Sequence, residues 1–211
     1  MQVIATNIGE RKTVSWNGEE LETGIFKYPV AGPLSLGSED VVNDNVVDRQ
    51  YHGGVDKACY LYSKDHYPHW KTLYPDLDWD WGQFGENLTV AGLDETELFI
   101  GDIYQVGNAV VQVSQPRVPC FKLGIRFDTQ KILKPFLQST FSGAYVRVLT
   151  PGTVQKGDTF VLQERQPDAL SVSQVYGLLS AKEPDQALLR KAIDDVNLSA
   201  EFKPALVLRV R

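Results

Sequence analysis

Cys120 is the residue whose type and setting could carry chemistry most directly. It lies in the segment Ser114-Gln115-Pro116-Arg117-Val118-Pro119-Cys120-Phe121-Lys122-Leu123. The two prolines fix the backbone and withhold two amide donors, which predicts a rigid loop rather than an interior strand. Arg117 and Lys122 lie close in sequence, and neighbouring cations favour the thiolate, the nucleophilic and metal-binding form of cysteine. The alternative is that Cys120 is a small buried core residue, as many free cysteines are.

A second candidate site is the polar segment from Asp48 to Lys57. The glycine pair after His52 allows a ligand to approach the backbone closely. His52 brings a titratable group, Asp56 an acceptor and Lys57 a cation, all within one loop. The alternative interpretation is an ordinary polar turn ahead of a strand that begins at Ala58.

Asn87 is a third candidate, in the glycine turn Gln83-Phe84-Gly85-Glu86-Asn87-Leu88. Its side chain could bind the amide edge of a ligand or could cap the turn. The chain contains neither GxGxxG nor GxxxxGK[ST], the glycine-rich patterns of nucleotide binding. It also lacks the GxSxG pattern of a serine nucleophile elbow.

Short strands are predicted to position these residues over most of residues 1–165. Asn17-Gly18 and Gly107-Asn108 each separate two runs of strand-forming residues, which predicts two hairpins, the first with a type I′ turn. The hairpin runs are Val14–Trp16, Glu20–Glu22, Ile103–Val106 and Val110–Val113, and the further strand candidates are Val3–Asn7, Ala58–Tyr62, Asn87–Val90, Ala144–Leu149 and Thr159–Gln163. Many short strands with few helices favour a barrel or sandwich. One helix is expected from an Asp128 cap to about Leu137.

The pattern becomes helical after a boundary at Glu164-Arg165-Gln166-Pro167-Asp168. Ser171-Val172-Ser173-Gln174 is a capping-box sequence, Pro184 is expected to open a second helix, and Ser199 is expected to cap a third near 201–210. Residues 166–211 are too few to hold a sizeable core alone. We therefore expect a β domain over residues 1–165 and a helical extension over residues 166–211 that packs on it or on a partner.

Composition excludes several classes of protein. The chain has 211 residues, 43% of them hydrophobic and 23% charged, which is typical of a globular protein. Its net charge of −6 gives no electrostatic reason to bind a nucleic-acid polymer or an anionic membrane. No apolar run reaches the roughly 18 residues that span a bilayer, and the N-terminal residues lack the pattern of a signal peptide. We expect a cytoplasmic protein.

The remaining cysteine and histidines have ordinary explanations. Cys59 and Cys120 are the only cysteines, too few for a disulfide scaffold, so both are expected to be free thiols. His66 and His69 are three residues apart, a spacing that could place both on one helical face for zinc. The residues around them favour a surface helix or turn instead.

Taken together, these segments resemble the MOSC domain family, named after the C-terminal domain of molybdenum cofactor sulfurase, in its stand-alone YiiM-like branch. The resemblance covers nearly the whole chain. Its most specific parts are the Gln-Pro-Arg-x-Pro-Cys block that ends at Cys120 and the His-Gly-Gly block that begins at His52. The other matching blocks are Thr23–Lys27, Phe84–Leu88, Gly101-Asp102, Arg147–Leu149 and Gly157-Asp158, and the tail from Ser171 resembles a three-helix extension of that branch.

The resemblance implies a mainly β, barrel-like fold that binds the molybdenum cofactor, with Cys120 as the sulfur ligand of the metal. The cofactor has an anionic phosphate, so an acidic protein must supply local cations. The cofactor-binding candidates are Lys27, Lys57, Asn87, Gln115, Arg117 and Lys122, with Arg147 as a weaker one and His52 as a proton donor or hydrogen-bond partner. Pyridoxal phosphate binding is a possibility at the level of the family only. Asn43-Asp44-Asn45-Val46-Val47-Asp48 departs from the glycine-containing acidic turn of the family, and Cys59, at a usually aliphatic position, is interpreted as core.

The function that the resemblance implies is molybdenum-dependent reduction of small N-hydroxylated substrates, such as N-hydroxylated bases. Since no flavin or haem motif is visible, the electrons would come from a separate reductase. One alternative is a sulfur carrier that uses a Cys120 persulfide for the assembly of metal–sulfur centres. A second is a non-catalytic module that binds a small ligand at the mouth of the barrel. The oligomeric state is left open.

Overall fold

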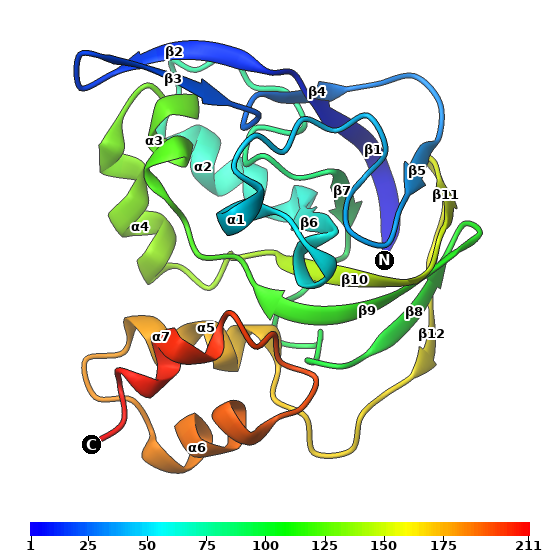
Figure 1. Cartoon of the computed structure of the whole chain (residues 1–211), viewed down its shortest axis with the longest axis vertical. Coiled ribbons are helices and arrows are strands. Elements are labelled where there is room, and N and C mark those ends of the chain that lie inside the picture. The colour runs from blue at the N-terminus through cyan, green and yellow to red at the C-terminus, as the bar shows by residue number, and fades with distance from the viewer.

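One sheet of eight strands forms the body of the protein in the computed structural model, which describes residues 1–211. Its order is β12-β8-β9-β10-β6-β7-β1-β4, and only β6 and β7 pair in parallel. The strands are β1 (Gln2–Gly9), β4 (Lys27–Pro29), β6 (Cys59–Ser63), β7 (Leu88–Ala91), β8 (Ile103–Val106), β9 (Ala109–Pro116), β10 (Ala144–Thr150) and β12 (Phe160–Glu164). The mainly β architecture expected from the sequence is confirmed (Figure 1).

The sheet curls until its two ends approach one another. Gln2 in β1 forms an isolated bridge with Thr159, next to β12. The amide of Val3 donates to the Asp158 carbonyl at 2.9 Å, and the amide of Phe160 donates to the Met1 carbonyl at 3.1 Å. These few bonds join the ends without a continuous ladder. The result is barrel-like, but the barrel is not closed.

Both predicted hairpins form. β2 (Lys12–Trp16) and β3 (Glu19–Thr23) flank Asn17 and Gly18, whose φ angles of 52° and 84° are those that a type I′ turn requires. β8 and β9 flank Gly107, which also has a positive φ. The three-residue strands β4, β5 (Leu34–Leu36) and β11 (Gly152–Val154) were not predicted, because three residues show no alternation to detect.

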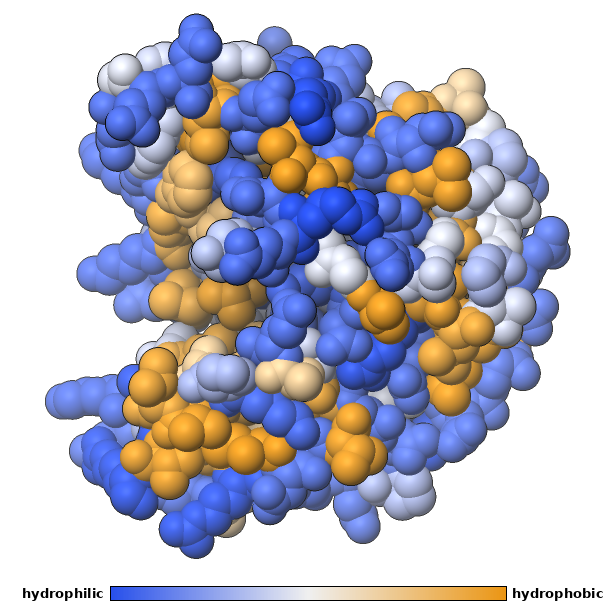
Figure 2. Space-filling view, in the orientation of Figure 1, coloured by the Kyte–Doolittle hydropathy of each residue, from blue (hydrophilic) through white to orange (hydrophobic).

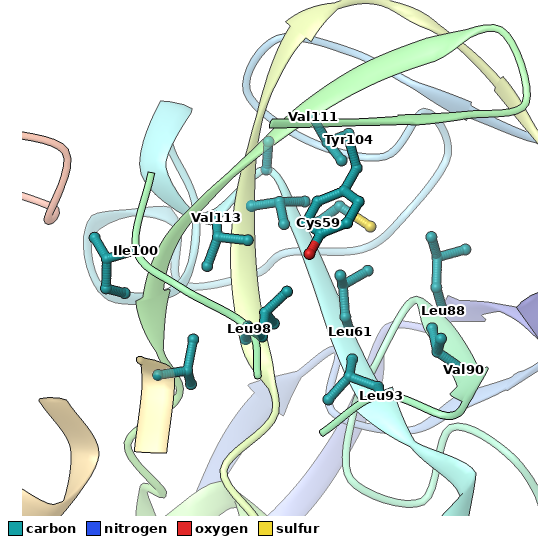
Figure 3. Packing of buried hydrophobic residues seen from close by; sticks show 14 of the residues in the cluster. Cys59, Leu61, Leu88, Val90, Leu93, Leu98, Ile100, Tyr104, Val111 and Val113 are labelled. Atoms are coloured by element: carbon teal, nitrogen blue, oxygen red, sulfur yellow. The ribbon is translucent and has the colours of Figure 1, made fainter. Parts of the chain in front are cut away.

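Strand β6 separates two hydrophobic clusters. Side chains alternate between the faces of a strand, so Cys59 and Leu61 face one side while Tyr60 and Tyr62 face the other. The first pair belongs to a cluster of 31 buried residues that fills the curl of the sheet (Figure 3). The second pair belongs to an aromatic cluster that includes residues of α2 (Tyr67–Leu73), α3 (Phe121–Arg126) and α4 (Leu133–Gln138). The aromatic face is also the face that borders the site described below.

The helix expected from an Asp128 cap begins one residue later. Thr129 is the cap, and its hydroxyl accepts from the amide of Lys131 at 3.3 Å. A 3-10 turn over Gln130–Ile132 then leads into α4, with Pro135 in the first turn. Asp128 has a φ of 51° and ends the preceding segment, so the prediction of an Asp128 cap was wrong.

Three helices follow the sheet, as expected, but two of their predicted starts were wrong. α5 (Val172–Ser180) begins with the predicted capping box between Ser171 and Gln174. α6 (Gln186–Asp194) is capped by Asp185, whose carboxylate accepts two amides, so Pro184 lies outside the helix. α7 (Lys203–Val207) is not capped by the Ser199 side chain, which has no hydrogen-bond partner.

The extension shares the core of the sheet. Val175 of α5, Leu189 of α6 and Phe202, just before α7, belong to the same hydrophobic cluster as Cys59. Figure 1 shows the three helices grouped beside β9. Exposed apolar side chains remain on the extension, including Leu208 at 86% exposure, and Figure 2 shows apolar residues gathered over this part of the molecule.

Candidate functional site

A cavity opens where the end of β9, the start of β6 and the loop over residues 44–48 meet. Its volume is about 700 Å³ when its open mouth is included. Short helical turns contribute to its wall, namely α1 (Arg49–His52) and the 3-10 turn Val55–Lys57. The lining residues are Thr23, Gly24, Ile25, Lys27, Asp44, Asn45, Val46, Val47, Asp48, His52, Lys57, Ala58, Tyr60, Gly85, Asn87, Arg117, Val118, Cys120, Lys122 and Tyr145.

Cys120 lies at the wall of this cavity. β9 ends at Pro116, and the loop predicted from the two prolines carries the chain to Cys120, directly before α3. The thiol is partly exposed, and its Sγ lies 3.8 Å from His52 Nε2. The two segments singled out in the sequence, 68 residues apart, therefore meet at this sulfur. The interpretation of Cys120 as a buried core residue is excluded.

Arg117 places a positive charge at the wall without a carboxylate partner. The residue is 5% exposed, and its guanidinium carbon lies 5.3 Å from the ring centre of Tyr60 and 5.4 Å from that of Phe136. Cation–π contacts of this kind stabilise a guanidinium without neutralising it. Its Nη1 is buried and has no hydrogen-bond partner in the protein. Such groups are normally satisfied, so this nitrogen is an unused donor on a residue that lines the cavity.

Lys27 is paired inside the wall. Its ammonium contacts Asp44, whose side chain is 2% exposed. Asp44 also accepts from the amide of Gly9 at 2.7 Å and from Asn87 Nδ2 at 2.9 Å. Asn87 in turn accepts from the amide of Tyr60 at 3.2 Å. Asn87 therefore holds the wall together, and its Nδ2 is already engaged by Asp44.

The other two lysines of the cavity also have carboxylate partners. Lys122 contacts Asp48 at 2.8 Å, and the hydrogen bond from Lys122 lowers the pKa of that half-exposed carboxyl. Lys57 contacts Glu201 of the extension at 2.7 Å and the carbonyl of Tyr51 at 2.9 Å. Four cations thus line the cavity against two lining carboxylates, Asp44 and Asp48. The cavity is locally positive in a protein whose net charge is −6.

His52 is held as a neutral imidazole. Burial lowers its pKa to about 4, and the positive charges of Lys122 and Arg117 act in the same direction. At neutral pH its ring can donate one hydrogen bond and accept one. It adds no positive charge to the cavity.

A buried carboxylate shapes the turn before Asn87. Glu86 accepts from the amides of Gly82 at 2.9 Å and Phe84 at 3.1 Å, and from the hydroxyl of Tyr67. Burial raises the pKa of Glu86. These contacts fix the glycine turn that carries Asn87 to the cavity wall.

Two sequence candidates lie outside the cavity. Gln115 is buried at the end of β9, where its Nε2 donates to the Pro116 carbonyl at 3.4 Å and its Oε1 has no partner. Arg147 pairs with Asp56 and donates to the Asn197 carbonyl at 2.7 Å. Neither residue is among those that line the cavity.

Three parts of the site were not predicted. In the sequence, Tyr60 and Tyr145 have the pattern of ordinary strand residues. Only the antiparallel pairing of β6 with β10 places them side by side, with ring centres 5.0 Å apart. Asp44 and Asp48 lie in the segment that departs from the acidic turn of the family, but the sequence does not indicate which lysines they contact. Glu201 carried no sequence signal, because its contact with Lys57 spans 144 residues.

The remaining histidines and Cys59 do not join the site. His66 contacts Glu95 at 2.8 Å, at the end of the 3-10 turn Lys64–His66, while His69 packs its edge against Trp70. No three His, Cys, Asp or Glu side chains are grouped so as to hold a metal ion. Cys59 is fully buried, and burial raises the pKa of its thiol to about 12, in agreement with its interpretation as core.

This fold and this site define a MOSC domain: the family model described as "MOSC domain" matches residues 48–161, and the chain belongs to that family. It is similar to the YflK protein of Bacillus subtilis (strain 168), with 39% identity over 81% of this chain and 76% of the relative. The crystal structure of YiiM from Geobacillus stearothermophilus superimposes with a TM-score of 0.82 at 33% identity, covering 100% of this chain and 99% of that one. The chain is therefore a YiiM-like member of the family.

A further relative is larger. A Gibberella moniliformis protein named "Reductase" is 37% identical over 82% of this chain, which corresponds to only 31% of that protein.

In this chain, no helix has the length and apolar character needed to cross a membrane.

Proposed function

We propose that the cavity binds the molybdenum cofactor through Cys120 and that the protein reduces small N-hydroxylated compounds. The observation that carries the proposal is the partly exposed Cys120 thiol at a cavity wall that also holds Arg117, whose buried Nη1 has no hydrogen-bond partner in the protein. MOSC domains are associated with the biology of the molybdenum cofactor, and a relative that is named a reductase supports an oxidoreductase.

The residues present fit this cofactor. A thiolate is a soft ligand that suits a sulfur-ligated metal centre. The phosphate of the cofactor requires cations, and Arg117 offers a buried donor that no protein group uses. Lys27, Lys57 and Lys122 add positive charge around it, although each already contacts a carboxylate. When bound, the cofactor would supply two-electron redox chemistry and accept an oxygen atom.

The protein groups have separate tasks in this proposal. Cys120 binds the metal, and Arg117 places a positive charge at the same cavity wall. His52 is within contact distance of the sulfur and, as a neutral imidazole, orients groups by hydrogen bonds. The loop over residues 44–48 forms one side of the cavity wall. Gln115 has no place in this scheme, because its side chain does not line the cavity.

The net reaction breaks the N–O bond of an N–OH group and releases the amine and water. It consumes two electrons and two protons for each substrate molecule. The chain has no flavin or haem motif, so the electrons come from a separate reductase protein in this proposal. The protons come from solvent through the open mouth of the cavity.

Molybdenum content and reductase activity test the proposal together. Protein purified gently from a host that makes the cofactor is expected to contain about one molybdenum per chain. It should reduce N-hydroxylaminopurine with a chemically reduced viologen as electron donor. Protein without molybdenum from such a host would contradict the proposal, and so would a Cys120→Ala variant with full activity.

The sulfur-carrier alternative rests on the same thiol and the same cations. A carrier would show a native mass increased by about 32 Da, the mass of one sulfur atom, and no stoichiometric molybdenum. Mass spectrometry of the native protein, before and after treatment with a reductant, separates the two functions.

A further inference from the structure

Lys57 lies between the cavity and the C-terminal extension. Its side chain is 12% exposed and lines the cavity, while its ammonium contacts Glu201 at 2.7 Å and the Tyr51 carbonyl at 2.9 Å. An ammonium has three donors, so these two contacts leave one for a ligand. Lys57 is therefore shared between the cavity and the extension.

The extension is fastened at this point by neighbouring contacts. The amide of Ser199 donates to the Ser114 carbonyl at 3.1 Å, close to the loop that carries Cys120. The Ser114 hydroxyl donates to the Asp56 carbonyl at 2.6 Å, directly before Lys57. Arg147 joins the Asp56 side chain to the Asn197 carbonyl. Glu201 is thus held opposite Lys57 by several independent bonds.

Glu201 differs from the two other carboxylates that contact cavity lysines. Asp44 and Asp48 lie in the cavity wall, on the loop over residues 44–48. Glu201 lies outside the wall, belongs to the extension and is 58% exposed at its side chain. It can leave the lysine without disturbing the wall, because water can solvate a carboxylate that is already half exposed.

We propose that Glu201 competes with anionic ligands for Lys57, so that the extension sets part of the affinity of the cavity for an anion. The inference rests on the proposed function only in that an anionic group, such as a phosphate, occupies the cavity. An anion that binds the Lys57 ammonium weakens the Lys57–Glu201 contact. By linkage, loss of the Glu201 charge strengthens anion binding by the same factor.

Substitution of Glu201 tests the competition. Glu201→Gln keeps an oxygen that can accept from Lys57 and removes the charge. The probe is inorganic phosphate, titrated by calorimetry into the chain of 211 residues from a host that cannot make the cofactor. Because an exposed carboxylate is partly screened, we expect phosphate to bind about 2–5-fold more tightly, with a smaller ratio at high salt.

Two comparisons make the result specific. Glu183→Gln removes a charge from the same extension at a site 3.9 Å from Arg211 and away from the cavity, and it should leave phosphate affinity unchanged. In a Lys57→Gln background, the effect of Glu201→Gln should disappear. Equal or weaker phosphate binding by Glu201→Gln overturns the inference. The same gain in the absence of Lys57 also overturns the inference, because the Glu201 charge would then act on the phosphate through the general electrostatic field and not through Lys57.

Failure of this inference is distinguishable from failure of the proposed function, because molybdenum content and N–OH reduction are measured separately. If neither the wild-type protein nor Glu201→Gln binds phosphate, the inference fails even if molybdenum is present.

Discussion

The two cysteines of this protein have opposite surroundings although they lie on neighbouring parts of one fold. Cys59 is in the central strand β6, fully buried among aliphatic residues of the curled sheet (Figure 3), and burial raises the pKa of its thiol to about 12. Cys120 is in a proline-fixed loop, partly exposed at a cavity with excess positive charge. The comparison shows that the role of a thiol is decided by its environment, because the residue itself is the same.

Strand alternation produces this difference over a very short distance. Tyr60 lines the cavity, and its neighbour Cys59 in β6 faces the other side of the sheet. A shift of one residue in the pairing of β6 with β10 would exchange the two faces. The pairs Tyr145–Tyr60 and Val146–Cys59 therefore separate the cavity from the core.

The two cysteine substitutions are expected to differ most in their effects on function. Cys120→Ser should lower molybdenum content and N–OH reduction by at least about 100-fold, since loss of a metal ligand costs no less than loss of an outer-shell partner. Cys59→Ser, compared as folded protein, should keep both. Elemental analysis and viologen-driven assays measure the two quantities. Equal losses in the two variants would remove the functional distinction between the thiols.

Asp44→Asn should have the largest effect on stability, although it lies on the cavity side. It leaves the buried ammonium of Lys27 without its charge partner, and breaking such a pair costs about 3–5 kcal/mol in the free energy of unfolding. Urea denaturation monitored by circular dichroism measures this change. A loss below about 1 kcal/mol would show that Asp44 is dispensable to the cavity wall.

Cys59→Ser should destabilise the protein by an intermediate amount. The substitution places a hydroxyl in a fully buried apolar setting, which costs about 1–3 kcal/mol when the group lacks a partner. Cys120→Ser should change the free energy of unfolding by less than about 0.5 kcal/mol, as is usual for partly exposed positions. Denaturation curves of the two variants give the comparison. A greater loss for Cys120→Ser would reverse it.

Asp48→Asn should have the smallest effect. Its partner Lys122 is buried, but the Asp48 side chain is 47% exposed, and such pairs contribute about 0–1 kcal/mol. Because Lys122 lowers the pKa of Asp48, this contribution is present above the pKa of the unfolded chain and is lost as the pH falls through the folded value. Denaturation of the wild type and the variant should show a smaller difference at pH 3 than at pH 7. The same difference at both pH values would contradict the ionic origin.

The sequence by itself determined several local elements of this protein and the loop that carries Cys120. Asn17-Gly18 specifies a hairpin because both residues tolerate a positive φ, and the Ser171 capping box specifies the start of α5 because its side chains satisfy local amides. The two prolines before Cys120 predict the loop because they cannot donate to a ladder. All of these are local effects, over a few residues of chain.

Only the tertiary structure decided which charged groups meet. It brings His52 to Cys120 and pairs Lys27 with Asp44 and Lys57 with Glu201. These three pairs join residues 17–144 positions apart, and none has a periodicity that a sequence pattern could reveal. The sheet must curl and the extension must dock before the electrostatics of the cavity exist. Charge pairing depends on distance in space, which the order of residues along the chain does not fix.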